Sequence, residues 1–163
     1  MDKYKGKVAK CHEINERLIA EVYTKAADLV SDPLLKGVFL FIAHDSLKHA
    51  EIFKELAAEY GVKELDPMDC AKFTGAGFGL MGLLKDAIRK LDEAKSDKEV
   101  LDIVHSIEIV ESTLVGLDRE ILVDDLKDLD KRIMYRELIR YIEEDEERHE
   151  KIIRDVYNFN NKK

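Results

Sequence analysis

The chain has no tryptophan, only two prolines and only two cysteines among its 163 residues. So few prolines leave long stretches free to form helix, and the abundant Glu, Lys, Leu, Ile and Ala favour helix over sheet. Cys11 and Cys70 form no CxxC pair, which argues against a zinc ribbon or an iron site held by four cysteines. For such a chain we expect a reducing, cytoplasmic setting.

Long apolar runs and basic runs are missing as well. No stretch approaches the roughly 20 apolar residues that a membrane span requires, and the first residues lack the apolar core of a secretion signal. The net charge is −8 and no cluster of Lys or Arg stands out, so we expect neither a nucleic acid nor a membrane as partner. The negative charge is better suited to cationic partners, including metal ions.

Apolar residues recur at helical spacing in most of the chain. The spacing predicts long helices over about 3–30, 33–60, 97–125 and 131–157. A shorter, extra helix is expected over about 78–94, in the glycine-rich connection between the second and third long helices. The length of the chain is that of one ordinary domain, so we expect residues 1–163 to form a single all-α domain.

Short signals mark the expected helix ends. Ser31 or Asp32, followed by Pro33, begins the second long helix, and Gly61 ends it. Residues 96–99, Ser-Asp-Lys-Glu, form a capping box that opens the third long helix. The first two helices are joined by so short a turn that they must lie antiparallel.

The second and fourth long helices repeat one pattern. Residues 41–53, FIAHDSLKHAEIF, align with residues 141–153, YIEEDEERHEKII. The identical positions are Ile42 and Ile142, Asp45 and Asp145, His49 and His149, and Ile52 and Ile152. The helices before them share an ExxE pattern, at Glu13 and Glu16 and at Glu108 and Glu111. The repeat predicts two similar helical hairpins, packed as an antiparallel four-helix bundle.

Each long helix turns at least one polar side chain toward the core. His149 shares its helix face with Ile142 and Ile153, and with the acids Asp145 and Glu146. A single histidine on an apolar face is most often a hydrogen-bonded core residue. Several buried carboxylates, however, cost much free energy without a cation, and two histidines cannot neutralise them. A pair of metal ions can, and carboxylate oxygens with imidazole nitrogens suit iron or manganese.

These residues resemble the ferritin-like superfamily, in particular the di-iron carboxylate proteins of the rubrerythrin and bacterioferritin type. That family places a Glu on the first and third long helices and a Glu-x-x-His on the second and fourth. The resemblance covers the four long helices but not the glycine-rich connection. It implies as metal ligands Glu16, His49, Glu111, Glu146 and His149, with Glu108 as a substitute for Glu111 or as an additional ligand. It implies as residues around the ligands Asp45, Asp145, Ser46, Asp118 and Tyr23.

The second long helix departs from the family pattern. Asp45 and His49 are kept, but Ser46 stands where the family has a Glu that bridges the metals, and a hydroxyl is a poor replacement. Either another acid such as Glu108 or Asp118 fills the gap, or water does, or one metal is held weakly. The expected cofactor is therefore two iron ions, or manganese or a mixed pair, with one position weaker than the other.

Three functions are compatible with this pattern. The first is a non-haem iron oxidoreductase that reduces peroxide or dioxygen, with electrons from a separate donor protein because the chain has no rubredoxin-like cysteines. The second is a non-catalytic protein that binds, stores or delivers iron or manganese; storage would require a homo-oligomer. The third is a structural bundle whose buried acids are paired or protonated. The missing Glu argues against a full ferroxidase of the storage-ferritin kind.

Overall fold

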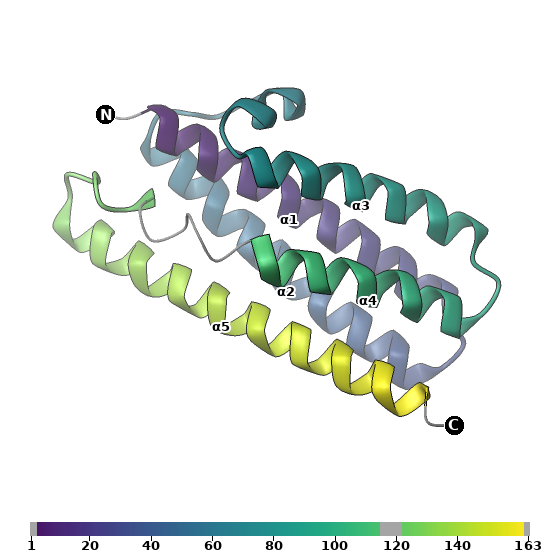
Figure 1. Ribbon diagram of the computed structural model, residues 1–163. Helices are drawn as coiled ribbons and strands as arrows, with labels where there is room; N and C mark the ends of the chain where they lie inside the picture. The colour runs from purple at the N-terminus through teal and green to yellow at the C-terminus, as the bar shows by residue number, and fades with distance from the viewer. Residues whose placement is uncertain (1–2, 115–121, 162–163) are drawn as a thin grey trace.

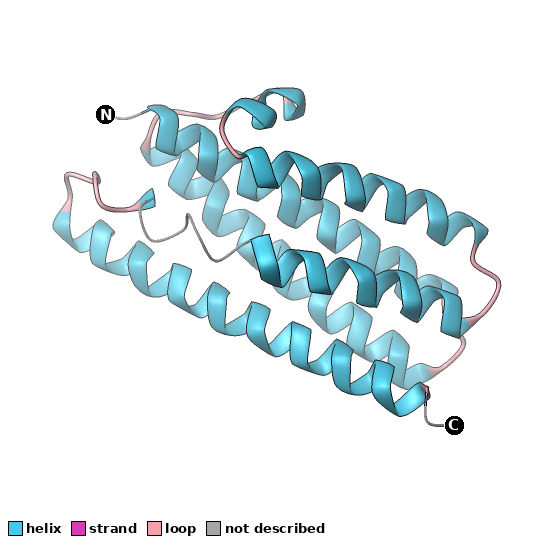
Figure 2. Ribbon diagram, in the orientation of Figure 1, coloured by secondary structure: helices cyan, strands magenta, loops and turns pink. Residues whose placement is uncertain are grey.

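The computed structural model describes residues 3–114 and 122–161, apart from the side chains of residues 75–78 and 111–114. The protein is all-helical, with no strand among these residues (Figure 2). The elements are α1 (Lys3–Leu29), α2 (Pro33–Glu59), the 3-10 helix η1 (Pro67–Lys72), α3 (Gly75–Glu93), α4 (Asp97–Leu114) and α5 (Leu129–Asn160). Within the described ranges, no helix combines the length and the apolar character needed to cross a membrane.

The long helices lie side by side along one common direction (Figure 1). α1 and α2 form an antiparallel hairpin, and α3 packs along α1 and α4. α5 packs against α4 and α2. α1, α3 and α5 run one way and α2 and α4 the other, so α2 and α5 are antiparallel neighbours.

Local hydrogen bonds explain where α2 and α4 begin. The Asp32 carboxylate accepts the backbone N–H of Leu34 at 2.7 Å, which caps α2. The backbone N–H of Glu99 donates to Ser96 Oγ at 3.2 Å, which is one half of the predicted capping box, and the Glu99 carboxylate accepts the backbone N–H of Lys95 at 2.7 Å. α2 ends just before Gly61, whose φ of 73° lies in the left-handed region that glycine adopts readily.

One helix end differs from the expected limits by more than a few residues. The third long helix was expected to continue to about residue 125, but residues 122–125 form turns rather than α-helix. Leu122 is buried there, and the hydroxyl of Tyr60 donates a hydrogen bond to its backbone carbonyl. Packing of this segment against the core therefore replaces helical hydrogen bonds. In addition, α3 begins at Gly75, three residues before the expected start.

The core contains two large apolar clusters with a polar layer between them. One cluster includes Tyr23, Phe39 and Ile42, and the other includes Phe53, Tyr60 and Ile142. The buried polar side chains between the clusters, along α1, α2 and α5, are those of Glu13, Asn15, Glu16, Asp45, Ser46, His49 and His149. The fold thus assembles polar groups from three helices at one level of the bundle.

A disulfide joins Cys11 of α1 to Cys70 of η1, with Cα atoms 5.6 Å apart. Both cysteines are buried, and Met81 of α3 packs beside them. The spacing in the sequence does not indicate this pairing, and a disulfide does not fit the reducing setting expected for the chain. The bond attaches the connection after α2 to the first helix.

Candidate metal centre

Two histidines, one on α2 and one on α5, each contact an aspartate on the other helix. His49 Nε2 lies 3.2 Å from Asp145 Oδ2, and His149 Nε2 lies 3.0 Å from Asp45 Oδ2. Because the two helices are antiparallel, the Asp that precedes each His by four residues lies opposite the other His. An ionised carboxylate only accepts hydrogen bonds, so each imidazole carries a proton on Nε2. The two rings stack with their centroids 6.2 Å apart.

The other ring nitrogen of each histidine faces glutamates. His49 Nδ1 lies 3.2 Å from Glu146 Oε1 and 3.5 Å from Glu16 Oε2. His149 Nδ1 lies 3.8 Å from Glu146 Oε2, so Glu146 approaches both imidazoles, one with each oxygen. Among the residues that the structure describes, ligand atoms of Glu16, His49 and Glu146 all lie within 4.8 Å of one another. These atoms converge on one small volume.

The acids around His49 change its protonation. Burial alone would lower the pKa of His49, but the carboxylates of Glu146 and Glu16 outweigh burial and raise the pKa to about 10. The pKa of His149 is also raised: burial opposes the shift, while Glu146 and Asp45 cause it. Without a metal, the site therefore balances its acids with protons on the imidazoles. Such protons are released when a metal ion takes their place.

Glu108 of α4 and Tyr23 of α1 form a second buried polar group. The Tyr23 hydroxyl donates to Glu108 Oε2, and the two residues are almost fully buried. Burial raises the pKa of Glu108 to about 7; the hydrogen bond from Tyr23 opposes the shift, and the charge of Glu146 adds to it. Because Glu146 and His149 both affect this pKa, Glu108 belongs to the same electrostatic environment as the histidines.

The structure describes most of the expected site residues, but not all of them. It brings together the residues expected on α1, α2 and α5, which are Glu16, Asp45, His49, Asp145, Glu146 and His149. Ser46 is buried on α2, and Tyr23 contacts Glu108. The side chain of Glu111 and all of Asp118 lie outside the described residues, so their roles stay predictions.

Sequence reasoning did not assign Lys48 and Arg148 to the site. Each forms an ion pair with the aspartate three residues before it, Lys48 with Asp45 and Arg148 with Asp145. The signal was present in the repeat, where a cation occupies the same position in both copies. A cation three residues after an acid on a helix usually forms an ordinary surface ion pair, because residues three apart share one face.

An apolar groove of about 380 Å³ lies between α2 and α5. Its lining residues are Pro33, Leu34, Gly37, Val38, Phe41 and Ile152. The ring of Phe41 meets the His149 imidazole edge-on, with centroids 6.0 Å apart. Phe41 is 43 % exposed, and its ring contacts both the groove and His149.

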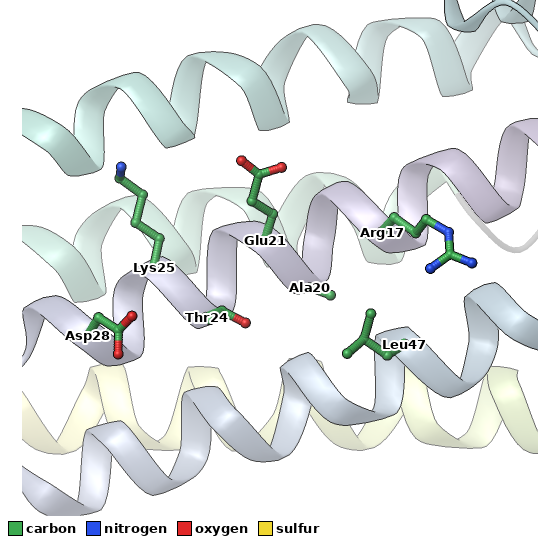
Figure 3. A pocket seen from close by; sticks show the side chains of 7 residues that line it. All are labelled: Arg17, Ala20, Glu21, Thr24, Lys25, Asp28 and Leu47. Carbon is green, nitrogen blue, oxygen red and sulfur yellow. The ribbon is translucent and has the colours of Figure 1, made fainter.

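A second groove, of about 470 Å³, runs along the outer side of α1 and includes Leu47 of α2 (Figure 3). Its two cations already have partners: Arg17 pairs with Glu51 at 2.7 Å and Lys25 with Asp92 at 2.5 Å. In Figure 3, Lys25 points away from α2, toward the side of α1 that faces α3. None of the histidines or acids of the candidate centre lines this groove.

The arrangement of the centre suits a hard cation, because imidazole nitrogens and carboxylate oxygens converge in a buried, acidic environment. No protein-family model matches the chain, and no curated protein or solved structure matches it.

Proposed function

We propose that this chain binds a pair of transition-metal ions, iron or manganese, between α1, α2, α4 and α5. The observation that carries the proposal is the reciprocal pairing of His49 with Asp145 and of His149 with Asp45. Metal-binding histidines commonly have such a carboxylate at one ring nitrogen, because it sets the tautomer and leaves the other nitrogen for the ion. Here the other nitrogens both face Glu146.

The donor set is chemically suited to these metals. Glu16, His49, Glu146 and His149 would hold the ions, and Glu108 and Glu111 of α4 would complete the set. Both cysteines of the chain are in the disulfide, so oxygen and nitrogen atoms are the ligands on offer. Such ligands suit iron and manganese better than soft metals. Ser46 supplies no carboxylate, so the two ions would differ in affinity.

We also propose a ferritin-like arrangement, in which α1 with α2 and α4 with α5 are two related hairpins and α3 is an addition. The support is the repeat of Asp45 and His49 in Asp145 and His149, together with the antiparallel contact of α2 and α5. The packing of α3 along α1 and α4 is compatible with a helix added to the outside of four others.

The proposed activity is reduction of peroxide or dioxygen, in the manner of rubrerythrin-like oxidoreductases. Bound iron would supply electrons and polarise the O–O bond. Reduction to water also consumes protons, which would come from solvent, while the buried carboxyl group of Glu108 would serve as a ligand. Tyr23 orients that carboxyl group by its hydrogen bond. Electrons would come from a separate donor protein.

A second candidate is a protein that binds, stores or delivers metal without turnover. The buried Ser46 favours it, because a centre with one fewer carboxylate than the family pattern would hold its second ion weakly. Storage requires a large hollow assembly, so the particle mass in solution decides that version. A monomer or a dimer excludes storage and leaves binding or delivery.

Metal analysis of the purified protein, as isolated and after incubation with ferrous iron or manganese, tests metal binding. The wild type should bind up to two ions per chain, and His149→Ala should lose most of them. His44→Ala is the matched control, because His44 is exposed on α2 and should not affect metal content. Full metal content in His149→Ala contradicts the ligand assignment, and a wild type without metal contradicts the proposal.

Steady-state assays then separate the two candidate functions. Iron-loaded protein with excess peroxide and a chemical reductant should turn over many times if the chain is an oxidoreductase. A single round of iron oxidation, with normal metal content, would favour the non-catalytic function.

A further inference from the structure

A layer of cations lies outside the two Asp–His pairs. Lys48 Nζ is 2.7 Å from Asp45 Oδ1, and Arg148 Nη1 is 2.8 Å from Asp145 Oδ1. In both aspartates the other oxygen, Oδ2, contacts the imidazole. Lys48 Nζ also lies 3.7 Å from Asp145 Oδ2, so it reaches both aspartates. Each carboxylate is thus held between a cation and a histidine.

The order of these groups runs from solvent to core. The side chains of Lys48 and Arg148 are 60 % and 50 % exposed, whereas those of Asp45 and Asp145 are 10 % and 15 % exposed. The histidine side chains behind them are 2 % exposed. The cations therefore cover the carboxylates on the side where water would otherwise contact them.

The cation that contacts Oδ1 of each aspartate changes how strongly Oδ2 attracts the imidazole proton. It withdraws negative charge from the carboxylate, which then attracts the imidazole proton less strongly. With the cation in place, the imidazole remains a neutral ligand with its proton on Nε2. Without it, the ring gains anionic character and becomes a more basic ligand.

We propose that Lys48 and Arg148 are positioning residues that raise the reduction potential of the metal centre, by holding Asp45 and Asp145 in place and weakening their pull on the imidazole protons. The inference rests on the proposed metal binding. Loss of either cation makes the ligands more basic and removes positive charge near the ions. Both effects favour the ferric state, so the potential should fall.

The test is the midpoint potential of the iron-loaded protein in Lys48→Met and Arg148→Met. Lys54→Met is the matched control for the first change, because Lys54 lies on the same helix and pairs with Glu51 at 2.8 Å and the same spacing of three residues. Arg154→Met is the control for the second change, since Arg154 pairs with Glu150 at 2.8 Å on α5. All four side chains are about half exposed, so the variants should fold.

In each test variant, the preference for ferric over ferrous iron should increase roughly tenfold, which lowers the midpoint potential by about 59 mV. The control variants should keep the wild-type potential. The conservative variants Lys48→Arg and Arg148→Lys should restore most of it, which a loss of packing alone would not explain. Metal content should be the same in all of these proteins.

A readout without redox chemistry comes from zinc-loaded protein. The Nε2–H protons of His49 and His149 should be visible by NMR in the wild type, because each is hydrogen-bonded and buried. Their exchange with solvent should be faster in Lys48→Met and Arg148→Met than in the two controls, because water then has more access to the carboxylates.

The outcomes distinguish this inference from the proposed function. An unchanged potential in both test variants, or an equal shift in their controls, overturns the inference while normal metal content leaves metal binding intact. A wild-type protein that takes up neither iron nor zinc overturns both.

Discussion

Asp45 and His149 are 104 residues apart in the chain, yet their side chains meet at 3.0 Å, and Asp145 and His49 repeat this relationship at 3.2 Å. The outer part of the centre is therefore nearly symmetric. The inner part is not, because α5 contributes Glu146 where α2 has Ser46 at the corresponding position. We expect this difference to distinguish the two proposed metal positions.

Replacing Asp145 by Asn should weaken metal binding about 10- to 100-fold, because outer carboxylates orient ligand histidines and raise their basicity. Competition with a chelator of known affinity measures the change. Asp155→Asn, on the exposed side of the same helix, should bind as tightly as the wild type. Equal affinities in the two variants would contradict the role given to Asp145.

Ser46→Glu should restore the missing acid and tighten the second metal position. In the absence of metal the same change should lower the free energy of unfolding, because it buries a further charge at a position only 1 % exposed. Added iron should then stabilise the variant more than the wild type. Thermal unfolding with and without iron checks this, and unchanged metal content would mean that another acid already bridges the ions.

The metal-free protein should lose stability as the pH rises. The folded-state pKa of His49 is raised from 6.5 to about 10, so its contribution is full below pH 6.5 and is lost as the pH rises toward 10. The pKa of Glu108 is raised from 4.5 to about 7, so its contribution to stability is also lost as the pH rises, between about 4.5 and about 7. Chemical denaturation with a chelator present, between about pH 6 and about pH 9, should show the decline. In His49→Gln, stability should decline less with pH in the upper part of this range.

Tyr23→Phe should lower the free energy of unfolding by about 1–3 kcal/mol, because the buried Glu108 carboxyl loses its hydrogen-bond donor. The loss should be smaller below pH 7, where Glu108 is protonated. Denaturant titration at two pH values measures both effects. Tyr141→Phe is the control, since Tyr141 is 53 % exposed and should tolerate the change.

Gly6→Ala should destabilise the fold by about 1–3 kcal/mol through overpacking. An added Cβ would lie 2.6 Å from Tyr60 Cβ and 2.8 Å from Val62 Cγ2. Gly37→Ala offers the opposite case: it lies within α2 with nothing within 4 Å of the new atom, so it should stabilise the helix by about 0.5–1 kcal/mol. Denaturant midpoints of the two variants should move in opposite directions.

Much of the helical structure follows from local signals. Periodicity predicts where α1 and α2 begin and end within one residue, because caps and apolar spacing are local properties. The same spacing places His49 and His149 on buried faces. The repeat also indicates that their neighbouring aspartates have equivalent surroundings.

Other features depend on contacts between distant segments. The Cys11–Cys70 disulfide requires that η1 returns to α1, and nothing in the spacing of two cysteines specifies that. The turns at 122–125 replace helix because Leu122 packs into the core. The pairing of Tyr23 with Glu108 depends in turn on how α1 and α4 pack. Membership of the ferritin-like superfamily stays a prediction.

The crossed aspartates have a consequence for folding. α2 and α5 each carry an imidazole whose orienting acid lies on the other helix, across 96 and 104 residues of sequence. Neither helix can orient its histidine alone, so the metal ion that we propose would bind tightly only after α5 has packed against α2. In the proposed metal protein, capture of the ion would therefore be a late step, and a bound ion would indicate that α2 and α5 have docked.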